Sequence, residues 1–96
     1  MHVHEEELAG KIWLIRIFED SKQYGDPYLN AVIAERYKDG SIELKALAKT
    51  PTPEELRLTV AWARGHGNPV YMIRMKNGVP VRHEFVTRKA ASAAKE

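Results

Sequence analysis

The residues with the clearest potential for chemistry are basic side chains in the second half of the chain. Between residues 57 and 89, seven positive charges stand against a single acidic residue, Glu84. The members of this basic run are Arg57, Arg64, Arg74, Lys76, Arg82, Arg88 and Lys89. Guanidinium and ammonium groups gathered in this way neutralise phosphates or carboxylates, so the run indicates an anionic partner.

The charge of the whole chain is polarised along the sequence. Its formal net charge is only +2, but residues 1–48 hold 6 basic and 9 acidic residues, whereas residues 49–96 hold 9 basic and 4 acidic residues. Such asymmetry is typical of a protein whose second half meets nucleic acid or an acidic protein. It is also typical of an ordinary solvated surface, and both interpretations stay open.

No catalytic or cofactor motif accompanies these charges. The chain has no cysteine, and neither His66 nor His83 has a nucleophile beside it in the sequence. His2 and His4 stand near three glutamates, but the end of a chain offers no second shell to orient their rings around a metal. The segment 64–67, Arg-Gly-His-Gly, is similar to an acetyltransferase phosphate loop but closes a helix instead of opening one. We expect a protein that is not an enzyme and has no metal and no cofactor.

Length and composition predict one domain over residues 1–96. Ninety-six residues, 44% of them hydrophobic, suffice for one core and not for two. Uncharged apolar stretches such as 28–34 are far shorter than the roughly 20 residues that span a bilayer, and the first residues lack the pattern of a signal peptide. We expect a cytoplasmic protein without membrane contact, flexible over 1–10 and 89–96.

Alternation and turn residues predict five strands and one helix. The first strand is apolar on both faces, which is typical of a central strand. The predicted strands are residues 11–19, 28–37, 41–49, 70–75 and 79–87. The predicted fold is therefore α+β, an antiparallel sheet of about five strands with one helix packed on one face, in the order β-β-β-α-β-β. Pro80 places the last strand at an edge.

Local signals define the helix, which we expect from residue 53 to about residue 64. Thr52 is the expected N-cap, Pro53 occupies the first helical position, and Glu55 completes a capping box. Gly65 is expected to end the helix in a left-handed conformation.

The predicted hairpin loops fix which residues face one another. A two-residue loop at Asp39 and Gly40 sets Arg36 opposite Glu43. A three-residue loop would oppose Glu35 and Glu43, which repel, so the shorter loop is favoured.

For the last hairpin we expect a three-residue loop of 76–78, which sets Ile73 opposite Val81. This register places Arg74 and Arg82 on one outer face, with Lys76 at the tip. The candidate binding residues for nucleic acid or another anionic partner are accordingly Arg64, Arg74, Lys76, Arg82 and Arg88.

A single helix covers one face of a sheet, yet the first predicted strand is apolar on both. A face bearing Val32, Leu47, Met72 and part of the first strand would be an exposed apolar patch in a monomer, and such patches mark interfaces. We therefore expect a homodimer formed through the sheet. Strong sheet curvature, or cover by the first residues, is the alternative.

Three segments carry a resemblance to known proteins: Ser-Ile-Glu-Leu-Lys-Ala-Leu from Ser41, Thr-Pro-Glu-Glu-Leu from Thr52, and a basic terminal hairpin. Over residues 30–86 the chain resembles short phage and prophage proteins. The resemblance implies a small accessory or host-directed protein and assigns no residue roles. Taken together, the sequence predicts a non-enzymatic interaction protein, with a nucleic-acid-binding module as the alternative.

Overall fold

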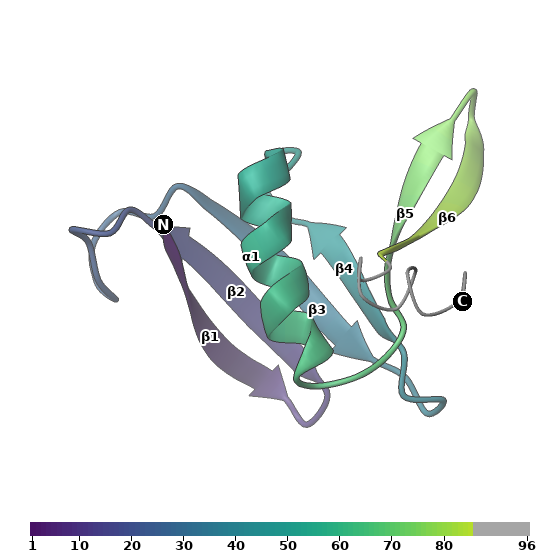
Figure 1. Ribbon diagram of the computed structural model, residues 1–96, viewed down its shortest axis with the longest axis horizontal. Coiled ribbons are helices and arrows are strands. Elements are labelled where there is room, and N and C mark those ends of the chain that lie inside the picture. The colour runs from purple at the N-terminus through teal and green to yellow at the C-terminus, as the bar shows by residue number, and fades with distance from the viewer. Residues whose placement is uncertain (86–96) are drawn as a thin grey trace, which may run out of the picture.

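The computed structural model describes residues 1–85, which form a six-stranded sheet with one helix lying across one face (Figure 1). The strands follow one another in the sheet in chain order. The elements are β1 (His2–Ala9), β2 (Ile12–Phe18), β3 (Asn30–Arg36), β4 (Ile42–Ala46), α1 (Pro53–Arg64), β5 (Val70–Lys76) and β6 (Val79–Phe85). The predicted α+β class, with one helix on a sheet, is confirmed for this part of the chain.

The sixth strand comes from residues expected to be a flexible lead-in. β1 pairs antiparallel with β2, from His2 opposite Phe18 to Ala9 opposite Ile12. Val3 packs against the core, and the N-terminal ammonium group lies 2.6 Å from the Asp20 carboxylate. Three consecutive glutamates hide the alternation of apolar and polar residues in β1. Charged side chains are common on edge strands, because they protect the edge against unwanted pairing.

The sheet is mixed, so the predicted fully antiparallel sheet is wrong at one junction. β5 pairs with β4 in parallel, from Ile42 opposite Val70 to Leu44 opposite Met72. The 12 residues of α1 return the chain by about 18 Å, at 1.5 Å per residue, toward the edge where β4 begins. A strand that starts again from that edge runs parallel to the one before the helix.

The core lies between α1 and the sheet face that the helix covers. Trp13, packed edge-on against Trp62 at 5.5 Å between ring centroids, closes one end of it. The buried strand residues of this face are Trp13, Ile15, Ile17, Val32, Ala34, Ile42, Leu44, Val70 and Met72. Val60 and Ala63 of α1 pack on them.

The predicted start of the helix is confirmed, and its cap also ties the helix to the sheet. Thr52 Oγ1 accepts from the Glu55 N–H at 3.1 Å, and Glu55 Oε1 accepts from the Thr52 N–H at 2.9 Å. The same carboxylate oxygen accepts from Asn30 Nδ2 at 3.1 Å, at the start of β3. Burial opposes ionisation, but the hydrogen bonds from Thr52 and Asn30, with nearby Lys49, leave the pKa of Glu55 below its ordinary value of 4.5.

The end of the helix differs from the expectation. Gly65 has φ −75° and is right-handed, so the predicted left-handed cap is wrong. The chain instead turns sharply, with the N–H groups of His66 and Gly67 both bonded to the Ala63 carbonyl oxygen. Gly67 then passes so close to β4 that a Cβ there would collide with the Gly40 carbonyl oxygen and the Ile42 side chain. This close approach is what requires glycine.

The β3–β4 register also differs from the expectation, since Glu35 faces Glu43 and Arg36 faces Ile42. The predicted two-residue loop is therefore wrong, and residues 38–40 form the connection. Lys45 Nζ lies 3.0 Å from a Glu35 carboxylate oxygen and 3.9 Å from one of Glu43. The Tyr37 hydroxyl donates to Glu43 at 2.8 Å, and this bond raises the pKa of Tyr37. These partners offset the repulsion that argued against the register.

The Glu55 network predicts a graded loss of stability. Glu55→Ala should lower the free energy of unfolding by about 2–3 kcal/mol, because it removes a helix cap and one of the acceptors of a buried amide. Glu55→Gln keeps an acceptor and should cost less than about 1 kcal/mol. Urea unfolding at pH 7 measures both changes in the free energy of unfolding. Equal losses in Glu55→Ala and Glu55→Gln would contradict the role of the Glu55 side chain as a hydrogen-bond acceptor in the cap.

The same network predicts a pH dependence. Because folding lowers the pKa of Glu55, its ionised form stabilises the protein above pH 4.5, and this contribution is lost as the pH falls through the folded-state pKa. The difference in stability between the wild type and Glu55→Gln should therefore shrink in acid. A difference that does not change with pH would be inconsistent with an ionised, hydrogen-bonded Glu55.

Candidate functional site

The β5–β6 hairpin closes with a two-residue turn. Asn77 and Gly78 both have positive φ, 53° and 78°, which defines a type I′ turn. Met72 consequently faces His83, and Ile73 faces Arg82. The predicted three-residue loop is wrong, because an Asn-Gly pair accepts positive φ at both positions and closes the shorter connection.

This register separates the two arginines that were expected to share a face. Directly opposed residues of an antiparallel pair point to the same side. Arg74 is opposite Val81, on the side that α1 covers, whereas Arg82 is opposite Ile73, on the open side of the sheet. A shift of one residue in pairing reverses the face of every side chain on the strand, so the predicted cluster of Arg74 and Arg82 is wrong.

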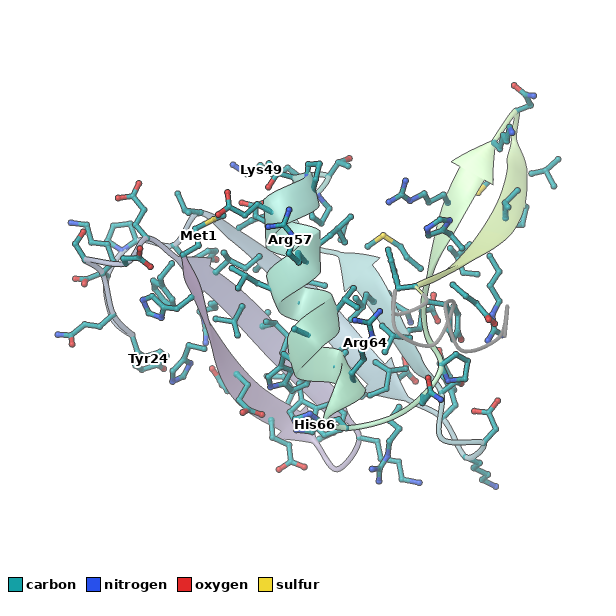
Figure 2. The ribbon with its side chains drawn as sticks, viewed as in Figure 1. Met1, Tyr24, Lys49, Arg57, Arg64 and His66 are labelled. Atoms are coloured by element: carbon teal, nitrogen blue, oxygen red, sulfur yellow. The ribbon has the colours of Figure 1, made fainter. Side chains whose placement is uncertain are left out.

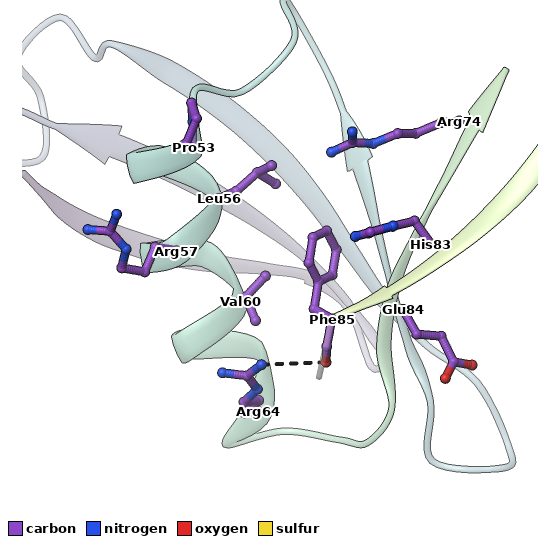
Figure 3. Close-up of a pocket in the computed structure, with 9 residues that line it drawn as sticks. All are labelled: Pro53, Leu56, Arg57, Val60, Arg64, Arg74, His83, Glu84 and Phe85. Atoms are coloured by element: carbon purple, nitrogen blue, oxygen red, sulfur yellow. Dashed lines mark hydrogen bonds between the residues drawn. The ribbon is translucent and has the colours of Figure 1, made fainter. Parts of the chain in front are cut away.

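A groove lies between α1 and the hairpin (Figure 3). Its volume is about 470 Å³, and Leu56, Val60 and Phe85 form its apolar floor. The other lining residues are Pro53, Arg57, Arg64, Arg74, His83 and Glu84. Arg74 and His83 extend from the hairpin toward the helix, while Glu84 points away (Figure 3). We call this site the basic groove.

The candidate residues have different places around the basic groove. Arg64 lies at its lower end and donates to the Phe85 carbonyl oxygen at 3.4 Å, and Arg74 lines the opposite wall. Lys76 is exposed beside the turn on the same face as Arg74 and does not line the groove. Arg82 lies on the other face, where its guanidinium stacks 3.9 Å from the Tyr71 ring centroid and pairs with Glu84. Arg88 lies outside the described residues.

Two groove residues were not among the candidates. Arg57 precedes Arg64 by two helical turns, and both side chains project from α1 in Figure 2. That spacing was a usable signal, because residues seven apart lie on nearly the same side of a helix. His83 was considered only as a catalytic group, and the observed register places it opposite Met72, on the side of α1, where it lines the groove.

The sheet face away from α1 is more polar than expected. Val32 and Met72, predicted to form an exposed apolar patch there, instead lie in the core on the helix side. Of the three predicted patch residues, Leu47 alone is exposed, at 56%. Charged side chains cover the open face, as Arg16 pairs with Glu6 at 2.8 Å and Lys45 pairs with Glu35. The predicted apolar patch is therefore wrong in its position.

The histidines considered for metal binding or catalysis pack against aromatic rings. His2 stacks on Phe18, and His4 stacks on Tyr24, which lies on the side of the molecule away from the hairpin (Figure 2). His66 stacks on Trp62 at 4.1 Å between ring centroids. Within residues 1–85, no three His, Asp or Glu side chains are grouped closely enough to hold a metal ion.

The chemistry of the basic groove is that of binding an anion. Two guanidinium groups and an imidazole surround an apolar floor, with Arg57 at the flank of the helix. Such a site can hold a phosphate or a carboxylate while burying an apolar group next to it.

No protein-family model matches the chain, and comparisons with curated proteins and with solved structures also found no match. The helix in the described part of the chain is too short and too polar to cross a bilayer.

Proposed function

We propose that the protein is a non-enzymatic interaction module that forms a homodimer through the open face of the β5–β6 hairpin. The observation that carries this proposal is the exposure of large apolar side chains on the hairpin. Ile73 and Met75, on the open face, are 41% and 68% exposed. Pro80, also exposed, lies opposite Met75.

The hairpin is poorly supported by its own chain. It is joined to β4 over residues 70–72, and from Ile73 to Glu84 every residue is exposed. Figure 1 shows it standing away from the rest of the sheet. A two-stranded hairpin is marginally stable in water, so a partner that covers its apolar face would stabilise it.

The charge on the open side of the hairpin fits a second copy better than it fits an anion. The arginine on this side of the hairpin, Arg82, is already paired with Glu84 at 2.8 Å and stacked on Tyr71. The open side of the hairpin therefore combines exposed apolar side chains with one internally paired arginine and is locally neutral, so two copies can meet there without repulsion between like charges.

Met75→Glu should convert the dimer into a monomer, because it places a charge in the proposed interface. Light scattering after size-exclusion chromatography gives the mass, and Leu8→Glu is the matched control. Leu8 is 52% exposed on β1, at the far edge of the sheet, so its variant should stay dimeric. A monomeric wild type, or a dimer that survives Met75→Glu, would sink the proposal.

A second candidate function is the binding of nucleic acid through the basic groove. It is supported by Arg57, Arg64 and Arg74 around one groove, with Lys76 further along the same face of the hairpin. The groove lies on the helix side of the hairpin, so it stays accessible in a dimer built on the open face.

Binding of a single-stranded oligonucleotide, followed by fluorescence anisotropy, should weaken steeply with salt. Three phosphate contacts give a slope of about −2 in a plot of log K against log salt concentration. Arg64→Glu combined with Arg74→Glu should weaken binding at least about tenfold at low salt, since each reversal replaces an attraction with a repulsion. Arg82→Glu, on the other face, should change it by less than about threefold. An equal effect of Arg82→Glu, or affinity independent of salt, would exclude this function.

A further inference from the structure

The parallel pairing of β4 and β5 stops before either strand ends. The last pair is Leu44 with Met72, although β4 continues to Ala46 and β5 to Lys76. Beyond it the two strands diverge (Figure 1). A cleft of about 450 Å³ opens between them, lined by Glu43, Leu44, Lys45, Ala46, Thr50, Pro51, Met72, Ile73, Arg74 and Met75. We call it the strand cleft.

The register shows which backbone groups face the strand cleft from β5. Lys76 and Val79 flank the two-residue turn and form a hydrogen-bonded pair. Hydrogen-bonded and non-hydrogen-bonded pairs alternate along an antiparallel ladder, so Arg74, two residues before Lys76, also directs its N–H and C=O groups to β6. Those of Met75 point the other way, toward β4. Within residues 1–85 no strand pairs with Met75 on that side.

The same alternation applies to β4. The Ile42 N–H donates to the Pro69 carbonyl oxygen, so residue 42 faces the β5 side, and residues 44 and 46 face it too. The main-chain groups of Lys45 point to β3 instead. Those of Leu47, two residues later, do the same, since the Leu47 N–H bonds to the Ala31 carbonyl oxygen. Ala46 therefore presents an N–H and a C=O to the strand cleft, and no described strand pairs with them there.

We infer that the strand cleft binds an extended segment of a partner protein, which adds a strand to the sheet between β4 and β5. Each wall offers the N–H and C=O groups of one residue, Ala46 on β4 and Met75 on β5, and an extended peptide satisfies such groups in β-augmentation. The cleft volume lies within the range of ligand sites, about 300–1,000 Å³. The inference deepens the proposed interaction function. The strand cleft shares Ile73 and Met75 with the proposed dimer surface, and it adds the main-chain groups of β4, which the dimer does not use.

The side chains around the cleft specify the chemistry of the segment. Arg74 lies on the helix side and makes no ion pair with another described residue. Ile73 and Met75 lie on the open side. The charged lining residue on that side, Lys45, is paired with Glu35 and lies 3.9 Å from Glu43. Because successive residues of a strand point to opposite faces, the best partner alternates acidic and apolar residues, with its carboxylates toward Arg74.

The test uses a blocked eight-residue peptide of alternating Glu and Val, titrated into the full chain and followed by amide NMR. We expect saturable shifts of the Ala46 and Met75 amides, with Kd below about 1 mM. A peptide of alternating Lys and Val should bind at least about fivefold more weakly. The Glu–Val peptide N-methylated at every second amide keeps its side chains and should not bind, because strand pairing needs the N–H groups.

A matched pair of variants tests the β4 wall. Ala46→Pro removes the cleft-facing N–H and should weaken binding at least about tenfold, whereas Ala46→Val keeps it and should stay within about threefold. No shift by any of these peptides, or equal binding of the N-methylated peptide, would overturn the inference. The N-methylated peptide keeps the test decisive even if Ala46→Pro fails to fold.

Light scattering of Ala46→Pro separates this inference from the proposed dimer. We expect Ala46→Pro to keep the mass of the wild type, because the hairpin side chains are unchanged. If Ala46→Pro instead abolishes a wild-type dimer, the occupant of the cleft is a second copy, and the choice of a foreign segment is overturned. A monomeric wild type that binds the peptide would contradict the proposed dimer and support peptide binding in the strand cleft.

Discussion

The three-residue ladder between β4 and β5 determines the arrangement of every surface considered for binding. It begins where Ile42 bonds to Pro69 and ends where Leu44 faces Met72. Because the pairing is so short, the β5–β6 hairpin is held to the sheet at its base alone, and its outer part stands apart from β4. The gap on the β4 side is the strand cleft, and the gap on the α1 side is the basic groove.

The beginning of the ladder is fixed by contacts of the segment that precedes β5. Gly67 passes against the Gly40 carbonyl oxygen, and the Asn68 N–H bonds to that same oxygen at 2.8 Å. The chain between α1 and β5 is thus held at the β3–β4 turn, which sets β5 to start beside Ile42. At the other end of the crossover, the Glu55 carboxylate joins the helix cap to Asn30. These contacts fix both ends of the helix, whereas every residue of the hairpin from Ile73 to Glu84 is exposed.

What the sequence predicted well has local causes. The helix start was predicted because Thr52, Pro53 and Glu55 form a capping box within four residues. The predicted registers of both hairpins were wrong, because a change of one residue in loop length changes every cross-strand pair. The contact between Glu35 and Glu43 is tolerated only with Lys45 and Tyr37 nearby, and no local rule supplies those partners. β1 and the parallel pair were missed because an acidic edge strand lacks clear alternation and because the direction of β5 depends on the crossover.

One wrong register had the larger consequence for the candidate site. It grouped Arg74 with Arg82, whereas the type I′ turn places Arg74 on the side of α1 and leaves Arg82 neutralised by Glu84. The hairpin thereby has two chemically different faces, since Arg74 and His83 point to the groove while Ile73 and Met75 point to the open side. A two-stranded ribbon exposed on both faces can bind an anion on one and an apolar partner on the other. The proposed self-association and the proposed anion binding therefore use different faces of this hairpin, and the turn at Asn77 and Gly78 is the element that separates the two faces.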